Sequence, residues 1–181
     1  MKNSEIIILD RDGVINIDSP DYIKSAAEFE PLPGSIEAIA RLFKSGFRIY
    51  VATNQAGLAK GKFDLQALRA MHQKLNDLVI QAGARIEQIF YCPHHPDEHC
   101  NCRKPAPGLL HQIAEHAGRS VFNQDFVGDS LKDIQAADAA GANPILVLTG
   151  NGTTTAQQID GEIPTFQDLA SYADFRLNKR R

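Results

Sequence analysis

The fold is decided by a short stretch near the start of the chain, residues 6–13, which reads Ile-Ile-Ile-Leu-Asp-Arg-Asp-Gly. Its first four residues are apolar and mostly β-branched, which is typical of a buried strand. The polar residues and the glycine that follow indicate that this strand ends at Leu9 and that the chain enters a loop. The carboxylates of Asp10 and Asp12 therefore stand just beyond a strand end, where open α/β sheets bind their ligands.

The pattern of an apolar run with a polar exit recurs along the chain and alternates with amphipathic segments. We predict further strands at 47–52, 86–91, 125–128 and 145–148, and helices at 34–44, 64–82, 107–117, 131–140 and 166–176. This alternation predicts a three-layer, Rossmann-like α/β fold, in which a parallel sheet carries helices on both faces. Residues 18–33 hold three prolines and no sustained period, so we expect a flap over the first strand end. The sheet's own crossovers account for the helices, and no large cap domain is expected.

Length, composition and charge limit the classes of protein to which the chain can belong. The chain has 181 residues, 43% hydrophobic and 23% charged, which fits one globular domain over residues 1–181. A net charge of −3 lacks the basic surplus of a nucleic-acid-binding protein. The first apolar run is far shorter than the roughly 20 residues of a membrane helix, so we expect a cytoplasmic protein with no membrane partner. We also expect a monomer, and we read residues 178–181 as a solvated helix end.

The pair Asp10 and Asp12 needs a cation or a shared proton. Two such charges about 4 Å apart repel by roughly 4 kcal/mol at an effective dielectric constant of 20. Mg²⁺ is the natural cation, because it binds carboxylates together with phosphate oxygens. Asp10 would then attack phosphorus as the nucleophile, and Asp12, held nearer neutrality by its neighbour, would be the general acid and base. A solvated turn would explain the pair equally well if it stood alone.

Four later residues offer partners for this chemistry. Thr53, after the second strand, can donate its hydroxyl to a phosphoryl oxygen, and Lys104 can supply positive charge to the transferring group. Asp129, after the fourth strand, can bind Mg²⁺, and Asp133 follows one helical turn later. Each has a plainer interpretation, namely an ordinary strand-end Thr, a surface Lys, a helix cap and a surface Asp. Together they predict a phosphatase site with an aspartyl-phosphate intermediate.

All three cysteines fall in one loop at about 92–102 with three histidines, in the order Cys92, His94, His95, His99, Cys100 and Cys102. In a reducing cytosol, three thiolates and one imidazole suit a closed, four-coordinate zinc site. Idle thiols are the alternative, and the residues alone leave open which histidine completes the set. Zinc would hold a loop that is too short to form its own core next to Arg103 and Lys104.

Four ordered segments resemble the motifs of the haloacid dehalogenase-like phosphatase superfamily: Asp10–Val14, Thr53–Gln55, Arg103–Pro105 and Gly128–Asp133. The longer strings DRDGVIN, TNQAGLAKG, CPHHP and CRKP, which begin at residues 10, 53, 92 and 102, resemble the D-glycero-D-manno-heptose 1,7-bisphosphate 7-phosphatase family. The resemblance implies removal of the 7-phosphate from that sugar bisphosphate. This step belongs to ADP-heptose biosynthesis, which feeds lipopolysaccharide core or other surface glycans. The resemblance also implies a catalytic Mg²⁺ and a structural Zn²⁺.

The resemblance further implies which residues bind each group. Mg²⁺ would be held by Asp10, Asp129 and the backbone carbonyl of Asp12. Zinc would be held by Cys92, His94, Cys100 and Cys102. The substrate would be contacted by Arg11, Asp18, Asp21, Tyr22, Asn54, Gln55, Ala56 and Arg103. Of these, Arg103 suits a sugar or a second phosphate because a guanidinium binds phosphate bidentately, although a surface Arg would look the same.

Two other functions compete with this interpretation. A histidinol-phosphate phosphatase resembles the sequence in chemistry and in its zinc loop, and only turnover of the two substrates separates it. A zinc-stabilised protein that binds phosphate without turnover belongs to another class. The complete set of Asp10, Asp12, Thr53, Lys104 and Asp129 argues against it.

Overall fold

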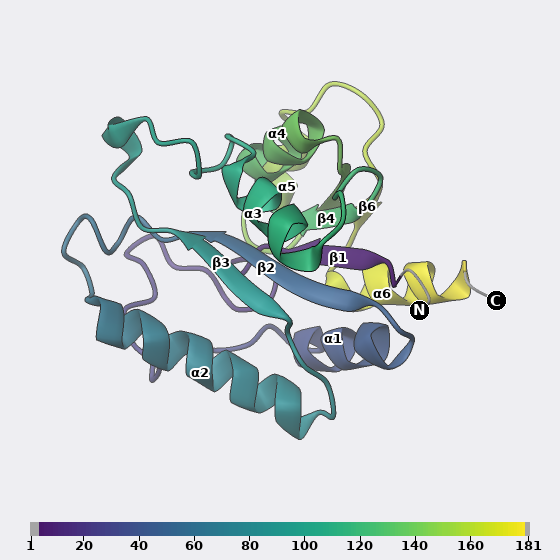
Figure 1. Cartoon of the computed structure of the whole chain (residues 1–181), viewed down its shortest axis with the longest axis horizontal. Helices are drawn as coiled ribbons and strands as arrows, with labels where there is room; N and C mark the ends of the chain where they lie inside the picture. Colours follow the sequence, from purple (N-terminus) through teal and green to yellow (C-terminus); the bar gives the residue numbers. More distant parts are fainter. Residues whose placement is uncertain (1–3, 180–181) are drawn as a thin grey trace.

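A six-stranded parallel sheet forms the centre of the computed structural model, which describes residues 4–179 (Figure 1). Its strands are β1 (Ile6–Leu9), β2 (Arg48–Asn54), β3 (Gln88–Cys92), β4 (Asp125–Gly128), β5 (Asn143–Val147) and β6 (Thr165–Phe166). They lie in the order β3-β2-β1-β4-β5-β6, and every neighbouring pair is parallel. The chain moves outward from β1 in both directions, so the carboxyl end of β1 lies at the switch point where such sheets bind ligands.

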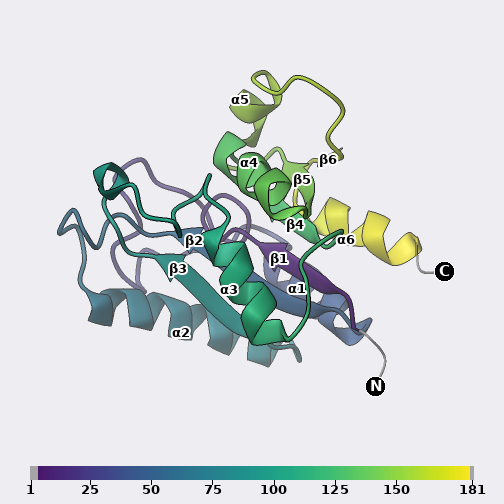
Figure 2. The same cartoon turned by 45° about the horizontal axis from the view of Figure 1, so that its top comes forward.

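Helices cover both faces of the sheet, as the sequence predicted. They are α1 (Ser35–Lys44), α2 (Leu65–Gln81), α3 (Gly108–Ala117), α4 (Leu131–Ala140), α5 (Gly152–Ala156) and α6 (Leu169–Asn178), with a 3₁₀ turn at Pro96–Glu98. Helices α1, α2 and α6 lie on one face, and α3 and α4 lie on the other (Figures 1 and 2). The described residues contain no separate cap domain.

The four apolar residues of β1 serve two different cores. Ile7 and Leu9 pack with the side chains of α1, α2 and α6, whereas Ile6 and Ile8 pack with those of α3 and α4. Successive side chains of a strand point to opposite faces, so a strand that is covered on both sides must be apolar throughout. This double burial explains why the strand leading to Asp10 shows no polar alternation.

Helix α2 begins where the sequence predicted and buries one stripe against the sheet. The Asp64 carboxylate accepts a hydrogen bond from the backbone N–H of Ala67 at 2.7 Å, which caps the helix. Leu68, Met71 and Leu75 are buried along this stripe. The stripe ends one turn later at Val79.

Several predicted boundaries are shifted, and short elements were missed. Strand β2 continues to Asn54, so Thr53 belongs to the strand and does not follow it. The last helix is α6, which starts later than predicted because Asp168 caps it. Helix α5 has no apolar period, and β6 is only 2 residues long, so neither leaves a sequence signal. The end of the predicted C-terminal tail, residues 180–181, lies outside the described residues. Among residues 4–179, no helix combines the length and apolar character needed to cross a membrane.

Candidate active site

An open cleft of about 730 Å³ lies at the carboxyl end of the central strands. Asp10, Thr53 and Asp129 reach it from β1, β2 and β4, and Lys104 joins them from the segment after β3. The backbone N–H of Asp10 donates to the carbonyl of Val127 at 2.9 Å, which extends the pairing of β1 and β4 up to the predicted nucleophile. The structure thus brings together residues that are far apart in the sequence.

The Lys104 ammonium is buried between two carboxylates. Its Nζ lies 2.9 Å from Asp10 Oδ1 and 2.6 Å from Asp133 Oδ1, and it donates to the carbonyl oxygen of Ala52 at 2.9 Å. The Asn54 side chain holds the Lys104 backbone from both sides, accepting from its N–H and donating to its carbonyl, each at 3.1 Å. With 2% of its surface exposed, Lys104 is no surface lysine.

Asp129 is aimed into the cleft by Asn151 and does not cap a helix. Its Oδ2 accepts from the backbone N–H of Asn151 at 2.7 Å and from the Asn151 side chain at 3.1 Å. Helix α4 is capped instead by Ser130, whose backbone N–H and hydroxyl donate to Asp133 Oδ2 at 3.0 and 2.7 Å. Gly13 gives Asp129 its space, because a Cβ there would lie 2.2 Å from Asp129 Oδ2.

The donor set at this point fits a hard cation. Oxygens of Asp10, Asp129 and Asp133 lie within 4.8 Å of one another, and Lys104 is the one cation among residues 4–179 in direct contact with two of them. Burial raises the pKa of Asp10 well above its usual value, although Lys104 lowers it in part. Burial and the nearby Asp133 raise the pKa of Asp129 to about 7. These raised pKa values arise first from burial and then from neighbouring carboxylates, and a divalent ion bound by Asp10 and Asp129 would supply positive charge that favours their ionised forms.

The prediction that Asp10 holds Asp12 nearer neutrality is wrong. Burial raises the pKa of Asp12, but the charge of Arg11 and hydrogen bonds from Asn16, Arg11 and Gln55 outweigh burial, and the net pKa is lowered. The Arg11 guanidinium lies 2.8 and 3.0 Å from the two carboxylate oxygens, and the Asn16 and Gln55 amides each donate at 2.9 Å. Repulsion by Asp10 alone would raise the pKa of Asp12, but the Arg11 side chain folds back onto its neighbour and lowers it.

Gln55 also orients the hydroxyl of Thr53. Its Nε2 donates to Thr53 Oγ1 at 2.9 Å as well as to Asp12. Because a lone pair of the Thr53 oxygen is occupied by this donor, the hydroxyl hydrogen is free to point into the cleft. The Thr53 hydroxyl is therefore available as a donor to an oxygen bound in the cleft.

The predicted substrate contacts fall into two groups. Residues that line the cleft are Asp18, Tyr22, Asn54 and Arg103. Residues whose side chains the structure does not bring to the cleft are Arg11, Asp21, Gln55 and Ala56. The Arg11 and Gln55 side chains are directed at Asp12, Ala56 is buried, and the exposed Asp21 pairs with Lys24 and Lys62.

One wall of the cleft was missed by sequence reasoning. It is formed by side chains of α4, α5 and their adjoining loops, among them Lys132, Gln135, Asn151, Thr154 and Gln158. Lys132 lies inside the motif that contains Asp129, so its position was a usable signal. The residues around α5 carry no motif and no period, and only the tertiary structure reveals them.

The cysteine loop forms a second cluster with the geometry of a metal site. His94 Nδ1 lies 3.5 Å from Cys92 Sγ and 3.2 Å from Cys102 Sγ, and Cys100 Sγ lies 3.5 and 3.6 Å from the other two sulfurs. These separations are close to the edges of a tetrahedron around an ion with metal–sulfur bonds of about 2.3 Å. Of the three histidines, His94 is the one placed within this set.

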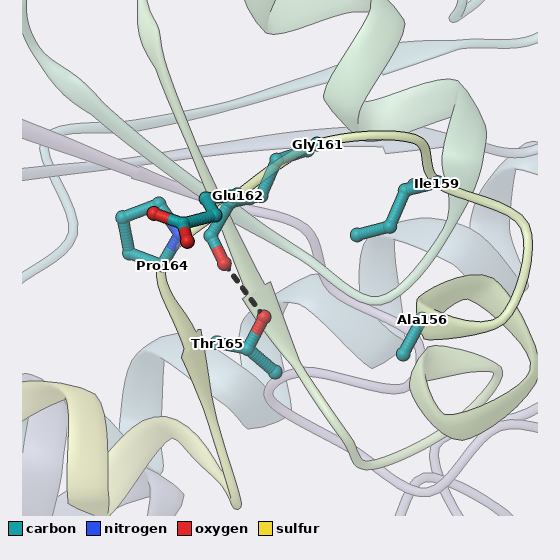
Figure 3. Close-up of a pocket in the computed structure, with 7 residues that line it drawn as sticks. Ala156, Ile159, Gly161, Glu162, Pro164 and Thr165 are labelled. Atoms are coloured by element: carbon teal, nitrogen blue, oxygen red, sulfur yellow. Dashed lines mark hydrogen bonds between the residues drawn. The ribbon is translucent and has the colours of Figure 1, made fainter.

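Another hollow, of about 540 Å³, lies between α5 and β6 (Figure 3). Among the residues that line this hollow, only Glu162 is ionisable. The hydroxyl of Thr165, which also lines it, donates to the backbone carbonyl of Ile163 at 2.8 Å. It offers no cation for a phosphate, so the chemistry belongs to the cleft at Asp10.

Comparisons with known proteins agree with this site. A family model described as "HAD-hyrolase-like" matches residues 101–171, and the sheet, the acidic cleft and the buried lysine define a hydrolase of this haloacid dehalogenase-like class. The D-glycero-beta-D-manno-heptose-1,7-bisphosphate 7-phosphatase of Pseudomonas aeruginosa is 51% identical over 95% of this chain and 97% of its own length. The Escherichia coli enzyme of that name is 37% identical over 84% of each chain.

A solved structure gives the same result. The D,D-heptose 1,7-bisphosphate phosphatase of Bordetella bronchiseptica, crystallised with magnesium and phosphate, superimposes with a TM-score of 0.94 at 45% identity, covering 97% of this chain and 99% of that one. The chain belongs to the D-glycero-beta-D-manno-heptose-1,7-bisphosphate 7-phosphatase family.

Replacing Lys104 tests the charge balance of the cleft. In a Lys104→Met variant with chelator present, Asp10 loses its cation, so its folded-state pKa rises further above the unfolded value. A carboxylate whose pKa is higher in the folded state than in the unfolded state stabilises the fold at low pH. This stabilisation is lost as the pH rises from the unfolded-state pKa through the folded-state pKa. We expect urea unfolding to show a loss of about 3–5 kcal/mol at pH 8 and a smaller loss at pH 5.

The exposed Lys132 of the same cleft provides the matched control. A Lys132→Met variant should stay within about 0.5 kcal/mol of the unsubstituted protein at both pH values. If the Lys104→Met variant lost the same free energy at pH 5 and pH 8, the described charge balance would be incorrect.

Proposed function

We propose that this protein is a Mg²⁺-dependent phosphatase that removes the 7-phosphate of D-glycero-D-manno-heptose 1,7-bisphosphate and leaves the heptose 1-phosphate, a step of ADP-heptose biosynthesis. The observation that carries the proposal is the Asp10 carboxylate, held against Lys104 at the carboxyl end of β1 in a chain of this family. The reaction is hydrolysis of a phosphoric monoester through an aspartyl phosphate. The magnesium and phosphate of the Bordetella bronchiseptica structure support the same chemistry.

In the first step, an Asp10 carboxylate oxygen attacks phosphorus and the bond from phosphorus to the sugar O7 breaks. Lys104 and Thr53 stabilise the charge on the transferring phosphoryl group. Mg²⁺, held by Asp10, Asp129 and the Asp12 backbone carbonyl, supplies charge neutralisation when bound. The product of this step is Asp10 phosphate and an alcohol that has received a proton.

Asp12 moves the protons in both steps. It donates a proton to the departing O7, and in the second step it takes a proton from the water that attacks the phosphorus of Asp10 phosphate. The ionised form that Arg11 favours is the form required of the base. An approaching phosphate repels an ionised Asp12, so substrate binding shifts the carboxyl toward the protonated form required of the acid.

Specificity resides in the part of the cleft beyond the reacting carboxylates. Asp18, Tyr22 and Asn54 offer polar groups for sugar hydroxyls, and Arg103 offers a guanidinium for the retained 1-phosphate. One buried nitrogen of Arg103, Nη1, has no hydrogen-bond partner within the described protein, which supports a role toward the substrate.

The cysteine cluster holds structural Zn²⁺ in this proposal, with Cys92, His94, Cys100 and Cys102 as a closed ligand set. Zinc would act on catalysis through structure, because Arg103 and Lys104 directly follow the last ligand. We further propose that residues 1–181 act as one phosphatase domain with its zinc loop at about 92–102, and that the protein is a cytoplasmic monomer.

Parallel turnover assays test the substrate. With Mg²⁺ present, phosphate release from heptose 1,7-bisphosphate should exceed release from histidinol phosphate by orders of magnitude in kcat/KM. Both anomers of the bisphosphate should be assayed. A preference for histidinol phosphate would replace the proposed substrate, and tight phosphate binding without turnover of either compound would favour the non-catalytic alternative.

Asp10→Asn tests the nucleophile. The variant should release no phosphate above background, because an amide cannot form the acyl phosphate. It should remain folded, since Lys104 keeps Asp133 as a partner. Circular dichroism and urea unfolding check the fold, and an Asp138→Asn variant, at an exposed position of α4 outside the cleft, controls for the loss of a carboxylate. Near-normal turnover by Asp10→Asn would exclude Asp10.

Metal analysis tests the zinc site. Freshly purified protein should hold about one zinc per chain, and a chelator should lower its melting temperature even when Mg²⁺ is restored afterwards. A Cys100→Ser variant should bind zinc more weakly, whereas His95→Gln should not. Protein that is purified without zinc and is indifferent to chelation would refute the site.

A further inference from the structure

His72 occupies an unusual place on α2, between the buried stripe of this helix and the active site. Its Nε2 lies 3.3 Å from Nη1 of Arg11, and its ring packs at a tilt against Tyr91, with centroids 5.8 Å apart. It belongs to none of the sequence motifs, and its helical position alone marks it as an ordinary residue of an amphipathic helix.

The protonation state of His72 fixes the direction of its hydrogen bond. Burial, and then the charge of Arg11, lowers its pKa to about 3, so the ring is neutral at physiological pH. Arg11 Nη1 can only donate, and therefore Nε2 of His72 is the acceptor and its proton resides on Nδ1. The imidazole is thus the partner for the one terminal nitrogen of Arg11 that faces away from Asp12.

Each of the three nitrogens of the Arg11 guanidinium has a partner, and one face of the group lies over an aromatic ring. Its Nε and Nη2 lie 3.1 and 2.8 Å from Asp12 Oδ1, its Nη1 meets His72, and its carbon lies 5.9 Å from the centre of the Phe29 ring. A guanidinium that is fixed in this way presents a rigid fork to the carboxylate. The remaining donors to Asp12, from Asn16 and Gln55, then complete one orientation of the acid.

We propose that His72 is a positioning residue, which holds Arg11 so that the guanidinium orients the Asp12 carboxyl for proton transfer to the leaving oxygen. The inference rests on the proposed function, because it assumes that Asp12 is the general acid. Loss of the acceptor at position 72 would let the guanidinium rotate and would misplace Asp12 by a fraction of an ångström or more. Such displacements of a supported group are costly to catalysis.

Three variants separate the hydrogen bond from packing. In His72→Gln the side-chain amide oxygen can reach the place of Nε2, in His72→Asn it is one methylene too short, and in His72→Leu an apolar group fills the space without an acceptor. Gln73→Leu, at the exposed neighbouring position of the same helix, is the matched control. Circular dichroism and melting temperature report whether each variant folds.

The readout compares kcat/KM for two leaving groups. Departure of a sugar alkoxide needs a proton from Asp12, whereas p-nitrophenolate leaves without one, and kcat/KM reports only steps up to that departure. We expect His72→Leu and His72→Asn to lose about tenfold to a hundredfold on heptose 1,7-bisphosphate and less than about threefold on p-nitrophenyl phosphate. His72→Gln should recover to within about threefold on both substrates, and Gln73→Leu should be unchanged.

Other results overturn the inference. Equal losses on both substrates would mean that His72 acts through general structure, and no loss on either would mean that it has no role. A selective defect that His72→Gln did not relieve would exclude the hydrogen bond to Arg11. If His72→Leu does not fold, the Gln and Asn variants carry the same comparison. Absence of turnover of both substrates by the unsubstituted protein would instead overturn the proposed function itself.

Discussion

The buried ammonium of Lys104 is the interaction on which the rest of the site depends. It binds Asp10 beyond β1, Asp133 in the first turn of α4 and the carbonyl of Ala52 in β2, so one charge joins three elements of the sheet and its helices. Two carboxylates could not be buried side by side without it, because each would carry an uncompensated desolvation cost. In the proposed mechanism this buried charge also faces the phosphoryl group, so stability and catalysis would draw on a single residue.

The sheet order gives that interaction its place. Strand β1 is apolar on both faces and lies between β2 and β4. From β1 the strand order runs outward to both edges of the sheet, so the carboxyl end of β1 opens into the crevice at this switch point. Helices on each face then deliver the remaining groups. Helix α4 brings Asp133 to Lys104, and α2, on the opposite face, brings His72 to Arg11. In this proposal Asp12 is oriented from the face that carries α2, while the proposed nucleophile Asp10 is paired with Lys104, which Asp133 of α4 also contacts.

Sequence reasoning succeeded where the signal was local. The run before Asp10, the cap at Asp64 and the alternation of strands and helices predicted the fold class, and polar strand exits located Asp10 and Asp129. It failed where a side chain's direction depends on tertiary contacts. Arg11 was expected at the substrate and instead holds Asp12, which reverses the expected direction of the Asp12 pKa shift. His72 is hidden within an ordinary helical stripe, and the wall at α5 has no pattern in the sequence.

Chemical trapping of the aspartyl-phosphate intermediate tests whether Asp10 is the nucleophile. Protein mixed with heptose 1,7-bisphosphate and Mg²⁺ would be quenched with borohydride, which reduces an aspartyl phosphate to homoserine, and digested for mass spectrometry. We expect the modification to map to Asp10 and to be absent without substrate. Modification of another acidic residue, or turnover with no trapped intermediate at any quench time, would contradict this role.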